Sequence, residues 1–162
     1  MIRPLTIDDA AQLAALLVSN REFLAPFEPE RPDEYFTVES QRSRIEAADH
    51  FFAILDRDAV AGTIALSNVV RGPFQSANLG YWVDRARNGR GLATGAVDAV
   101  VKRAFTELGL HRIEAATLVD NVASQRVLEK TGFRRIGTAA HYLRIAGSWR
   151  DHVVFQQTVE DR

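Results

Sequence analysis

The chain has 162 residues, of which 46% are hydrophobic and 25% are charged, and its formal net charge is −1. This length is typical of one domain, so we expect a single domain over residues 1–162. The apolar fraction excludes a disordered chain, and the near-zero net charge argues against direct nucleic-acid binding. The chain has no cysteine, which excludes disulfides, thiolate-bound metal and a cysteine nucleophile.

Neither a membrane span nor a leader is predicted. No apolar run approaches the roughly 18 residues needed to cross a bilayer, and no basic and apolar signal opens the chain. We therefore expect a cytoplasmic protein without membrane contact, and the sequence suggests no metal site.

The first half of the chain predicts two helices among four strands. Thr6 and Asp9 have the spacing of a capping box, which predicts a helix from here to about Val18. Thr37 stands where it can cap a second helix. The predicted elements around these caps are strands at Met1–Leu5, Phe51–Leu55, Val60–Val70 and Ala77–Val83, and a second helix at Val38–Ala48.

The second half contains the clearest helix, Leu92–Leu108, whose apolar residues recur at helical spacing and which Gly109 ends. The elements predicted after it are a strand at Ile113–Val119, a helix at Val122–Lys130, and closing strands at Phe133–Gly137 and Val153–Val159. The order β-α-α-β-β-β-α-β-α-β-β predicts a mixed sheet with helices on its faces, an α/β or α+β domain.

The most informative segment runs from Tyr81 to Thr94. A strand leads into a turn that contains Gly89 and Gly91, and the longest helix follows at once. The free N–H groups at such a helix start bind phosphate, and glycine lets the main chain approach closely. The segment lacks the Gly-Lys-Ser/Thr of a P-loop and the third glycine of a dinucleotide fingerprint. From the residues alone, an ordinary turn with solvated arginines remains an alternative.

Two stretches resemble the GNAT superfamily of N-acetyltransferases. Their acetyl-CoA loop has the pattern Gln/Arg-x-x-Gly-x-Gly/Ala, which Asn88-Gly89-Arg90-Gly91-Leu92-Ala93 matches with Asn in the first position. The run Asn121–Phe133, with N-x-x-S followed by L-E-K-x-G-F, looks like the RimJ/RimL branch, which acetylates N-termini of ribosomal proteins. Further similar stretches are Asn20–Pro29, Ser67–Gly72, Leu79–Tyr81 and Trp149–Val153.

The resemblance covers nearly the whole chain and implies the GNAT fold. That fold has a central, mostly antiparallel sheet that is splayed at the cofactor site, with helices on both faces. The resemblance also implies direct transfer of an acetyl group from acetyl-CoA to a primary amine, the N-terminal α-amine of a ribosomal protein. The residues to which it assigns cofactor contacts are Trp82, Val83, Asn88, Gly89, Arg90, Gly91, Leu92, Ala93, Thr94 and Asn121.

Two catalytic residues are expected. The resemblance implies that Ser124 protonates or hydrogen-bonds the leaving thiolate. We expect His141 to act as the base, because histidine titrates near neutrality and related enzymes present a polar side chain there. An α-amine has a pKa of about 8, so a weak base is enough.

Simpler interpretations stay open for several residues. Asn121 can be a helix cap, Ser124 and Lys130 can be solvated, and His152 can form a structural hydrogen bond with Asp151.

Other functions also remain open. The acidic residues Glu28, Glu30, Asp33 and Glu34 would suit a cationic acceptor, or form a solvated loop. The alternatives are an enzyme of the same fold that acetylates a small amine (an antibiotic, polyamine or amino acid) and a non-catalytic acyl-CoA-binding module. We expect a monomer or a homodimer.

Overall fold

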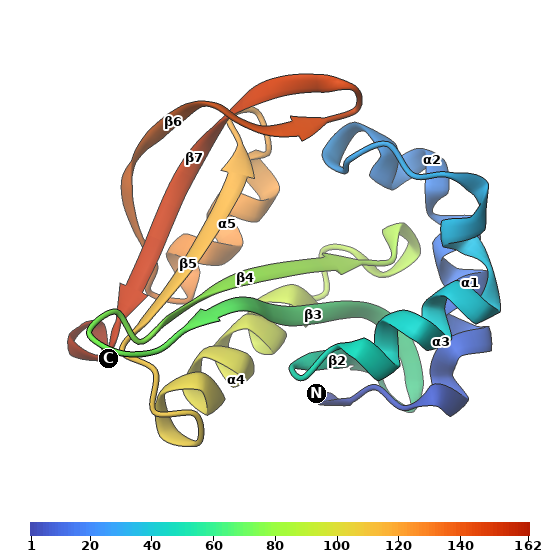
Figure 1. Ribbon diagram of the computed structural model, residues 1–162, viewed down its shortest axis with the longest axis horizontal. Helices are drawn as coiled ribbons and strands as arrows, with labels where there is room; N and C mark the ends of the chain where they lie inside the picture. The colour runs from blue at the N-terminus through green and yellow to red at the C-terminus, as the bar shows by residue number, and fades with distance from the viewer.

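A seven-stranded sheet with helices on both faces forms the protein, in a computed structural model that describes residues 1–162 (Figure 1). The strand order is β1-β2-β3-β4-β5-β7-β6. The strands are β1 (Ile2–Pro4), β2 (Phe51–Asp56), β3 (Ala59–Val70), β4 (Ser76–Val83), β5 (Arg112–Leu118), β6 (Arg134–Ile145) and β7 (Ser148–Thr158). The helices are α1 (Ala10–Ser19), α2 (Arg21–Leu24), α3 (Val38–Ala47), α4 (Leu92–Thr106) and α5 (Val122–Lys130). None of these helices is long and apolar enough to cross a membrane.

Alternation along β2 explains why helices cover both faces. Successive side chains of a strand point to opposite faces. Phe52 and Ile54 belong to the larger apolar core, which also contains buried residues of α4 and α5. Phe51, Ala53 and Leu55 belong to a second core that includes residues of α1 and α3. The mixed sheet with two helical layers is confirmed.

The sheet opens between β4 and β5. These two strands are parallel and pair over only three residues each, Ser76–Asn78 with Arg112–Glu114, whereas every other neighbouring pair is antiparallel. Beyond Asn78, β4 pairs only with β3 and β5 pairs only with β7, so the two strands diverge (Figure 1). The backbone groups of β4 that face the gap therefore have no strand partner. The expected splayed, mostly antiparallel sheet is confirmed.

The last two strands are longer than predicted. Instead of separate strands at Phe133–Gly137 and Val153–Val159, β6 and β7 form one long hairpin that turns at Ala146 and Gly147. Both turn residues have positive φ, 47° and 83°, as the tight turn of a two-residue hairpin requires. The predicted strand Phe133–Gly137 overlaps only the start of β6, and the full length of β6 was not predicted because most of its side chains are exposed and its pairing with β7 is interrupted by two register shifts.

Candidate active site

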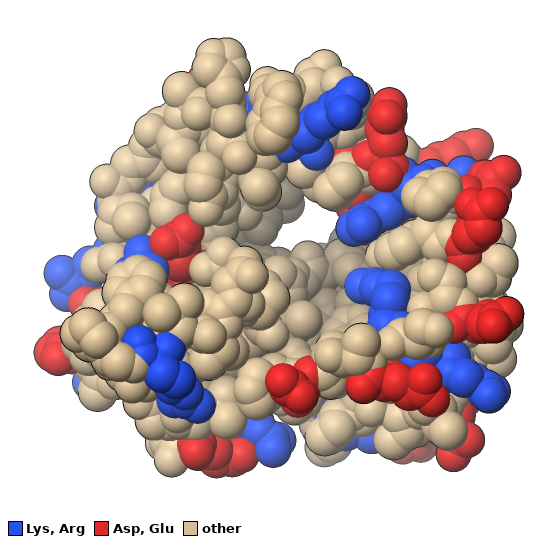
Figure 2. Space-filling view, viewed as in Figure 1, with Lys and Arg blue, Asp and Glu red and all other residues tan.

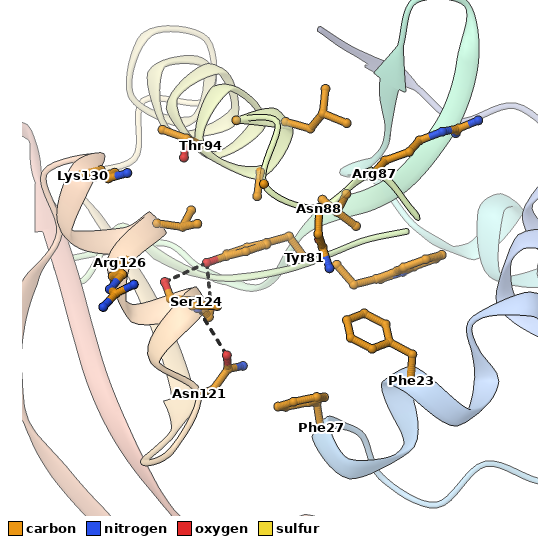
Figure 3. A pocket seen from close by; sticks show the side chains of 18 of the residues that line it. Phe23, Phe27, Tyr81, Arg87, Asn88, Thr94, Asn121, Ser124, Arg126 and Lys130 are labelled. Carbon is orange, nitrogen blue, oxygen red and sulfur yellow. Dashed lines mark hydrogen bonds between the residues drawn. The ribbon is translucent and has the colours of Figure 1, made fainter. Parts of the chain in front are cut away.

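A cavity of about 580 Å³ lies beside the diverging β4 strand, between the first turns of α4 and α5 (Figure 3). Phe23 of α2 and Phe27, just after it, contribute an aromatic wall facing β4 (Figure 3). Ten of the twelve residues that the sequence nominated line this cavity: Trp82, Val83, Asn88, Gly89, Gly91, Leu92, Ala93, Thr94, Asn121 and Ser124. The structure therefore brings together residues that are up to 42 positions apart, from Trp82 to Ser124.

The glycine turn at the start of α4 has the geometry of an anion cradle. Gly89 and Gly91 both have φ of +76°, a backbone conformation that residues with a Cβ rarely adopt. Gly91 is the N-cap of α4 and has no side chain to cap it. The N–H groups of Leu92, Ala93 and Thr94 thus have no partner within the helix, and all three residues line the cavity. Such a helix start carries partial positive charge and binds phosphate.

Two cations on α5 complete the positive end of the cavity. Arg126 and Lys130 line it four residues apart, on one side of the helix (Figure 3). Neither forms an ion pair within the chain. By contrast, Arg87 also lines the cavity but is already engaged, because its Nη1 donates a hydrogen bond to the Val60 carbonyl at 2.8 Å. Nothing in the local sequence around Arg126 had distinguished it from a solvated arginine.

Arg90 does not line the cavity. Its guanidinium makes a bidentate contact with Asp56, at the end of β2, with Nη2 3.1 Å from Oδ1. Its side chain therefore ties the glycine turn to the β2–β3 hairpin, and only its backbone belongs to the cradle.

Ser124 lies in the first turn of α5, where it is hydrogen-bonded to Asn121 and Tyr81. The Asn121 side chain accepts a hydrogen bond from the Ser124 N–H at 3.2 Å, so Asn121 is the helix cap as well as a cavity residue. The hydroxyl oxygens of Ser124 and Tyr81 are 2.7 Å apart (Figure 3). Burial raises the pKa of Tyr81 to about 12. The phenol therefore stays protonated near neutral pH and can donate to Ser124.

A second cavity of about 330 Å³ meets the first at this pair of hydroxyls. The two cavities share Phe27, Tyr81, Asn121 and Ser124. The other residues that line the second cavity are Leu79 and Gly80 of β4, Ala115–Leu118 of β5, Leu128 of α5, Leu143–Ile145 of β6, His152 of β7 and Pro29. Figure 2 shows an opening that passes through the molecule between β4 and the β5–α5 region. Two substrates can therefore approach the Tyr81–Ser124 pair from different directions.

His141 lines neither cavity. It lies in the irregular part of β6 between Ala139 and Leu143, with φ of +49° and an exposed side chain. Its backbone N–H donates a hydrogen bond to the Asp151 carboxylate at 2.9 Å. Asp151 is thus engaged with His141, and His152 contacts the Arg150 carbonyl instead, at 3.0 Å from Nδ1. The structure does not bring His141 together with Ser124, whereas it places His152 in the second cavity.

The backbone of the acidic segment after α2 is attached to the hairpin, while the side chains of Glu30, Asp33 and Glu34 are exposed. The Glu28 carbonyl accepts a hydrogen bond from the Ala146 N–H at 2.8 Å, and Asp33 pairs with Arg21 at 2.7 Å. Burial raises the pKa of the Glu28 carboxyl, against the opposing effect of two nearby arginines. Phe27 and Pro29, on either side of Glu28, line the second cavity. This segment therefore forms a wall of that cavity.

Comparisons with known proteins agree with this geometry. Residues 1–134 match the family model described as an acetyltransferase (GNAT) domain. The chain is 42% identical over 163 residues to the probable N-acetyltransferase YjcK of Bacillus subtilis (strain 168), covering 94% of this chain and 90% of that protein. It is 34% identical over 163 residues to the ribosomal protein uS5-alanine N-acetyltransferase of Escherichia coli (strain K12), covering 94% and 84%. The structure of Mycobacterium smegmatis RimJ in complex with CoA-disulfide superposes with a TM-score of 0.93 at 32% identity, covering 99% of this chain and 82% of that chain.

Proposed function

Because this chain belongs to the GNAT acetyltransferase family, whose members transfer acetyl groups from acetyl-CoA, we propose that its acceptor is the N-terminal α-amine of a ribosomal protein. The observation that carries this proposal is the meeting of two cavities at Tyr81 and Ser124. One cavity has the positive cradle that a CoA pyrophosphate needs, and the other is open to an amine. The Escherichia coli relative, named for the alanine of a ribosomal protein, supports the choice of acceptor. The proposal also places the reaction in the cytoplasm.

The first cavity fits acetyl-CoA. The N–H groups from Gly89 to Thr94 hold the pyrophosphate, and Arg126 and Lys130 neutralise further phosphate charge. The end of β4 at Trp82 and Val83 has backbone groups without a partner strand on the β5 side. Those groups and the Asn121 amide can hydrogen-bond the amides of the pantetheine arm. A bound acetyl-CoA supplies a thioester carbonyl for the amine to attack.

Acetyl transfer at the Tyr81–Ser124 pair, where the two cavities meet, needs little chemical assistance from the protein. The acceptor nitrogen bonds to the acetyl carbon, the bond from that carbon to sulfur breaks, and the electron pair stays on sulfur. An acceptor that arrives as an ammonium ion loses two protons in total, one of which ends on the sulfur while the other reaches solvent. Either hydroxyl of this pair can be the donor; when Tyr81 donates to the Ser124 hydroxyl oxygen, the Ser124 O–H is free to stabilise the developing thiolate.

The experiment that tests the acceptor is a panel assayed with acetyl-CoA by release of the free CoA thiol. The panel contains peptides that begin with Ala or Ser, the same peptides with a formylated N-terminus, and spermidine as a small amine. We expect turnover with the free peptides only. Turnover with spermidine alone would identify a small-amine acetyltransferase. No turnover by a protein that binds acetyl-CoA in calorimetry would identify a binding module.

A further inference from the structure

The second cavity contains one histidine that the reaction scheme above does not use. His152 of β7 is only 3% exposed, yet it lines this cavity together with Tyr81 and Ser124. In the sheet it lies opposite Leu118, the last residue of β5, after which the chain leads through Asn121 into α5. The imidazole is therefore built into the end of the sheet at which the amine must meet the thioester.

The hydrogen bonds of His152 fix which nitrogen can accept a proton. Nδ1 is 3.0 Å from the carbonyl oxygen of Arg150, and because a carbonyl can only accept, Nδ1 carries the hydrogen. In the neutral ring, Nε2 is then the atom with the free lone pair. The Tyr142 ring packs against the imidazole at a centroid distance of 5.6 Å and an interplanar angle of 60°, which restrains the orientation of the imidazole.

Nε2 of His152 keeps some access to solvent. No group of the chain hydrogen-bonds to Nε2. The fully buried side-chain nitrogen and oxygen atoms without a partner are the Arg31 Nε and the Gln157 Oε1, so Nε2 is not fully buried. The Nε2 atom of this almost fully buried residue must therefore reach open space, and the space that His152 lines is the second cavity.

No other residue that lines the second cavity is suited to accept a proton from the amine. No Asp, Glu or Lys lines it. Arg144 of β6 is permanently cationic, and Tyr81 of β4 has its pKa raised to about 12 by burial, so its phenol is already protonated. The Tyr142 hydroxyl beside the imidazole donates to the Glu114 carboxylate of β5 at 3.1 Å, and burial raises its pKa.

We propose that His152, through Nε2, is the catalytic base that takes a proton from the ammonium group of the acceptor. The inference rests on the proposed function, since it requires that an amine enters this cavity. The ammonium nitrogen loses one proton to Nε2 and becomes the neutral nucleophile, and the imidazolium later returns that proton to solvent. The second proton leaves the nitrogen after its bond to the acetyl carbon has formed and ends on the sulfur.

The test compares His152→Gln, which keeps the approximate volume and polarity of the site, with His111→Gln as a matched control. His111 is exposed and pairs with Glu160 outside both cavities. At pH 7 we expect His152→Gln to lower kcat/KM by up to roughly tenfold, because about a tenth of an α-amine is already neutral there, and the control to keep the wild-type value. The deficit should shrink above about pH 9, where an α-amine loses its proton without help. Acetyl-CoA affinity measured by calorimetry should stay unchanged.

A second readout on the wild-type protein does not depend on the variant's folding. Long-range ¹H–¹⁵N NMR of the histidine rings should show His152 with its hydrogen on Nδ1 in the neutral state. A hydrogen on Nε2, full kcat/KM in a folded His152→Gln variant, or a deficit that is the same at every pH would each overturn the proposal. The kinetic comparison uses whichever acceptor the wild-type protein turns over. If the acceptor is not a ribosomal protein, the role of His152 as the base can therefore still be tested.

Discussion

At the scale of single residues, the Tyr81–Ser124 contact is central because it lies where both cavities meet. The two hydroxyl oxygens are 2.7 Å apart, and burial raises the pKa of Tyr81 to about 12. A phenol with that pKa stays protonated near neutral pH, and an aliphatic hydroxyl is a still weaker acid, so both groups act on the thiolate as hydrogen-bond donors and not as proton sources. We therefore assign Ser124 the direct contact with sulfur and Tyr81 the orientation of the serine hydroxyl.

A double-mutant cycle tests this division of roles. Ser124→Ala should lower kcat by roughly 10²-fold, and Tyr81→Phe by roughly tenfold, with acetyl-CoA affinity almost unchanged in both. The double variant should be no slower than Ser124→Ala, since Tyr81 acts only through the serine. Tyr35→Phe, which removes a hydroxyl from a residue that lines neither cavity, should keep the wild-type kcat. Full kcat in Ser124→Ala would reduce Ser124 to an ordinary helix residue.

The glycine turn gives a prediction about binding rather than turnover. Gly91→Val places a β-branched side chain at φ of +76° and blocks the approach of a pyrophosphate. We expect calorimetry to show acetyl-CoA binding weakened at least tenfold, or about 1.4 kcal/mol. Gly109→Val is a matched control, because Gly109 also has positive φ (+62°) but follows the far end of α4. Equal affinity in a folded Gly91→Val protein would contradict the phosphate cradle.

The sequence predicted those site residues whose contacts are local. Asn121 caps the helix that carries Ser124 three positions later, and the glycine turn joins directly to α4. The turn was proposed from its two glycines before a helix, and the roles of Asn121 and Ser124 from the family resemblance of the run Asn121–Phe133. Tyr81 was not identified, because its partner Ser124 is 43 residues away and only the fold brings them together. Strand alternation offered a signal, since Tyr81 lies on the same face of β4 as Val83.

At the scale of elements, a single carboxylate links β1 to the start of the first helix. Asp9 receives a hydrogen bond from the Thr6 N–H at 2.8 Å, as the predicted capping box requires, and pairs with the Arg3 guanidinium at 2.7 Å. The structure adds that this cap begins a 3₁₀ turn at Ile7–Asp9, which leads into α1. The Arg3 hydrogen bond, together with that from Thr6, lowers the pKa of Asp9 to about 2.

That pKa predicts how stability depends on pH. A carboxyl whose pKa is lower in the folded state contributes stability above its unfolded pKa of about 4, and this contribution is lost as the pH falls towards 2. Asp9→Asn should therefore unfold about 1–2 kcal/mol more easily than wild type at pH 7, a value reduced for the solvent exposure of Arg3. The gap in urea titrations should close between pH 4 and pH 2. Asp8→Asn, at the exposed neighbouring position, should match wild type throughout, and a gap independent of pH would exclude this role for Asp9.

The β6–β7 hairpin shows why some elements were not predictable. Buried strands such as β2 and β5 have apolar or alternating patterns, whereas β6 is exposed along most of its length. Its conformation comes from pairing with β7 and from a turn at Ala146 and Gly147 that also binds the Glu28 carbonyl. The contact between Glu28 and Ala146 joins segments more than 100 residues apart, so no local pattern encodes it.

At the scale of the whole molecule, the split between β4 and β5 creates the site. Because the two strands pair over only three residues each, the rest of β4 is left open to a ligand while its other edge stays paired with β3. The larger core contains buried residues of both β4 and β5, so it packs against both sides of the split, and the opening is part of the fold. In the proposed function, donor and acceptor then occupy separate cavities that share four lining residues.

The most direct test of acetyl transfer to an α-amine is tandem mass spectrometry of a single peptide that carries a free N-terminal alanine and several internal lysines. The α-amine has a pKa of about 8, so roughly a tenth of it is neutral at pH 7, whereas fewer than one lysine in a thousand is. After incubation with acetyl-CoA and the wild-type protein, we predict one added acetyl group, located on the N-terminal alanine. Acetylation confined to the lysines would contradict the proposed function.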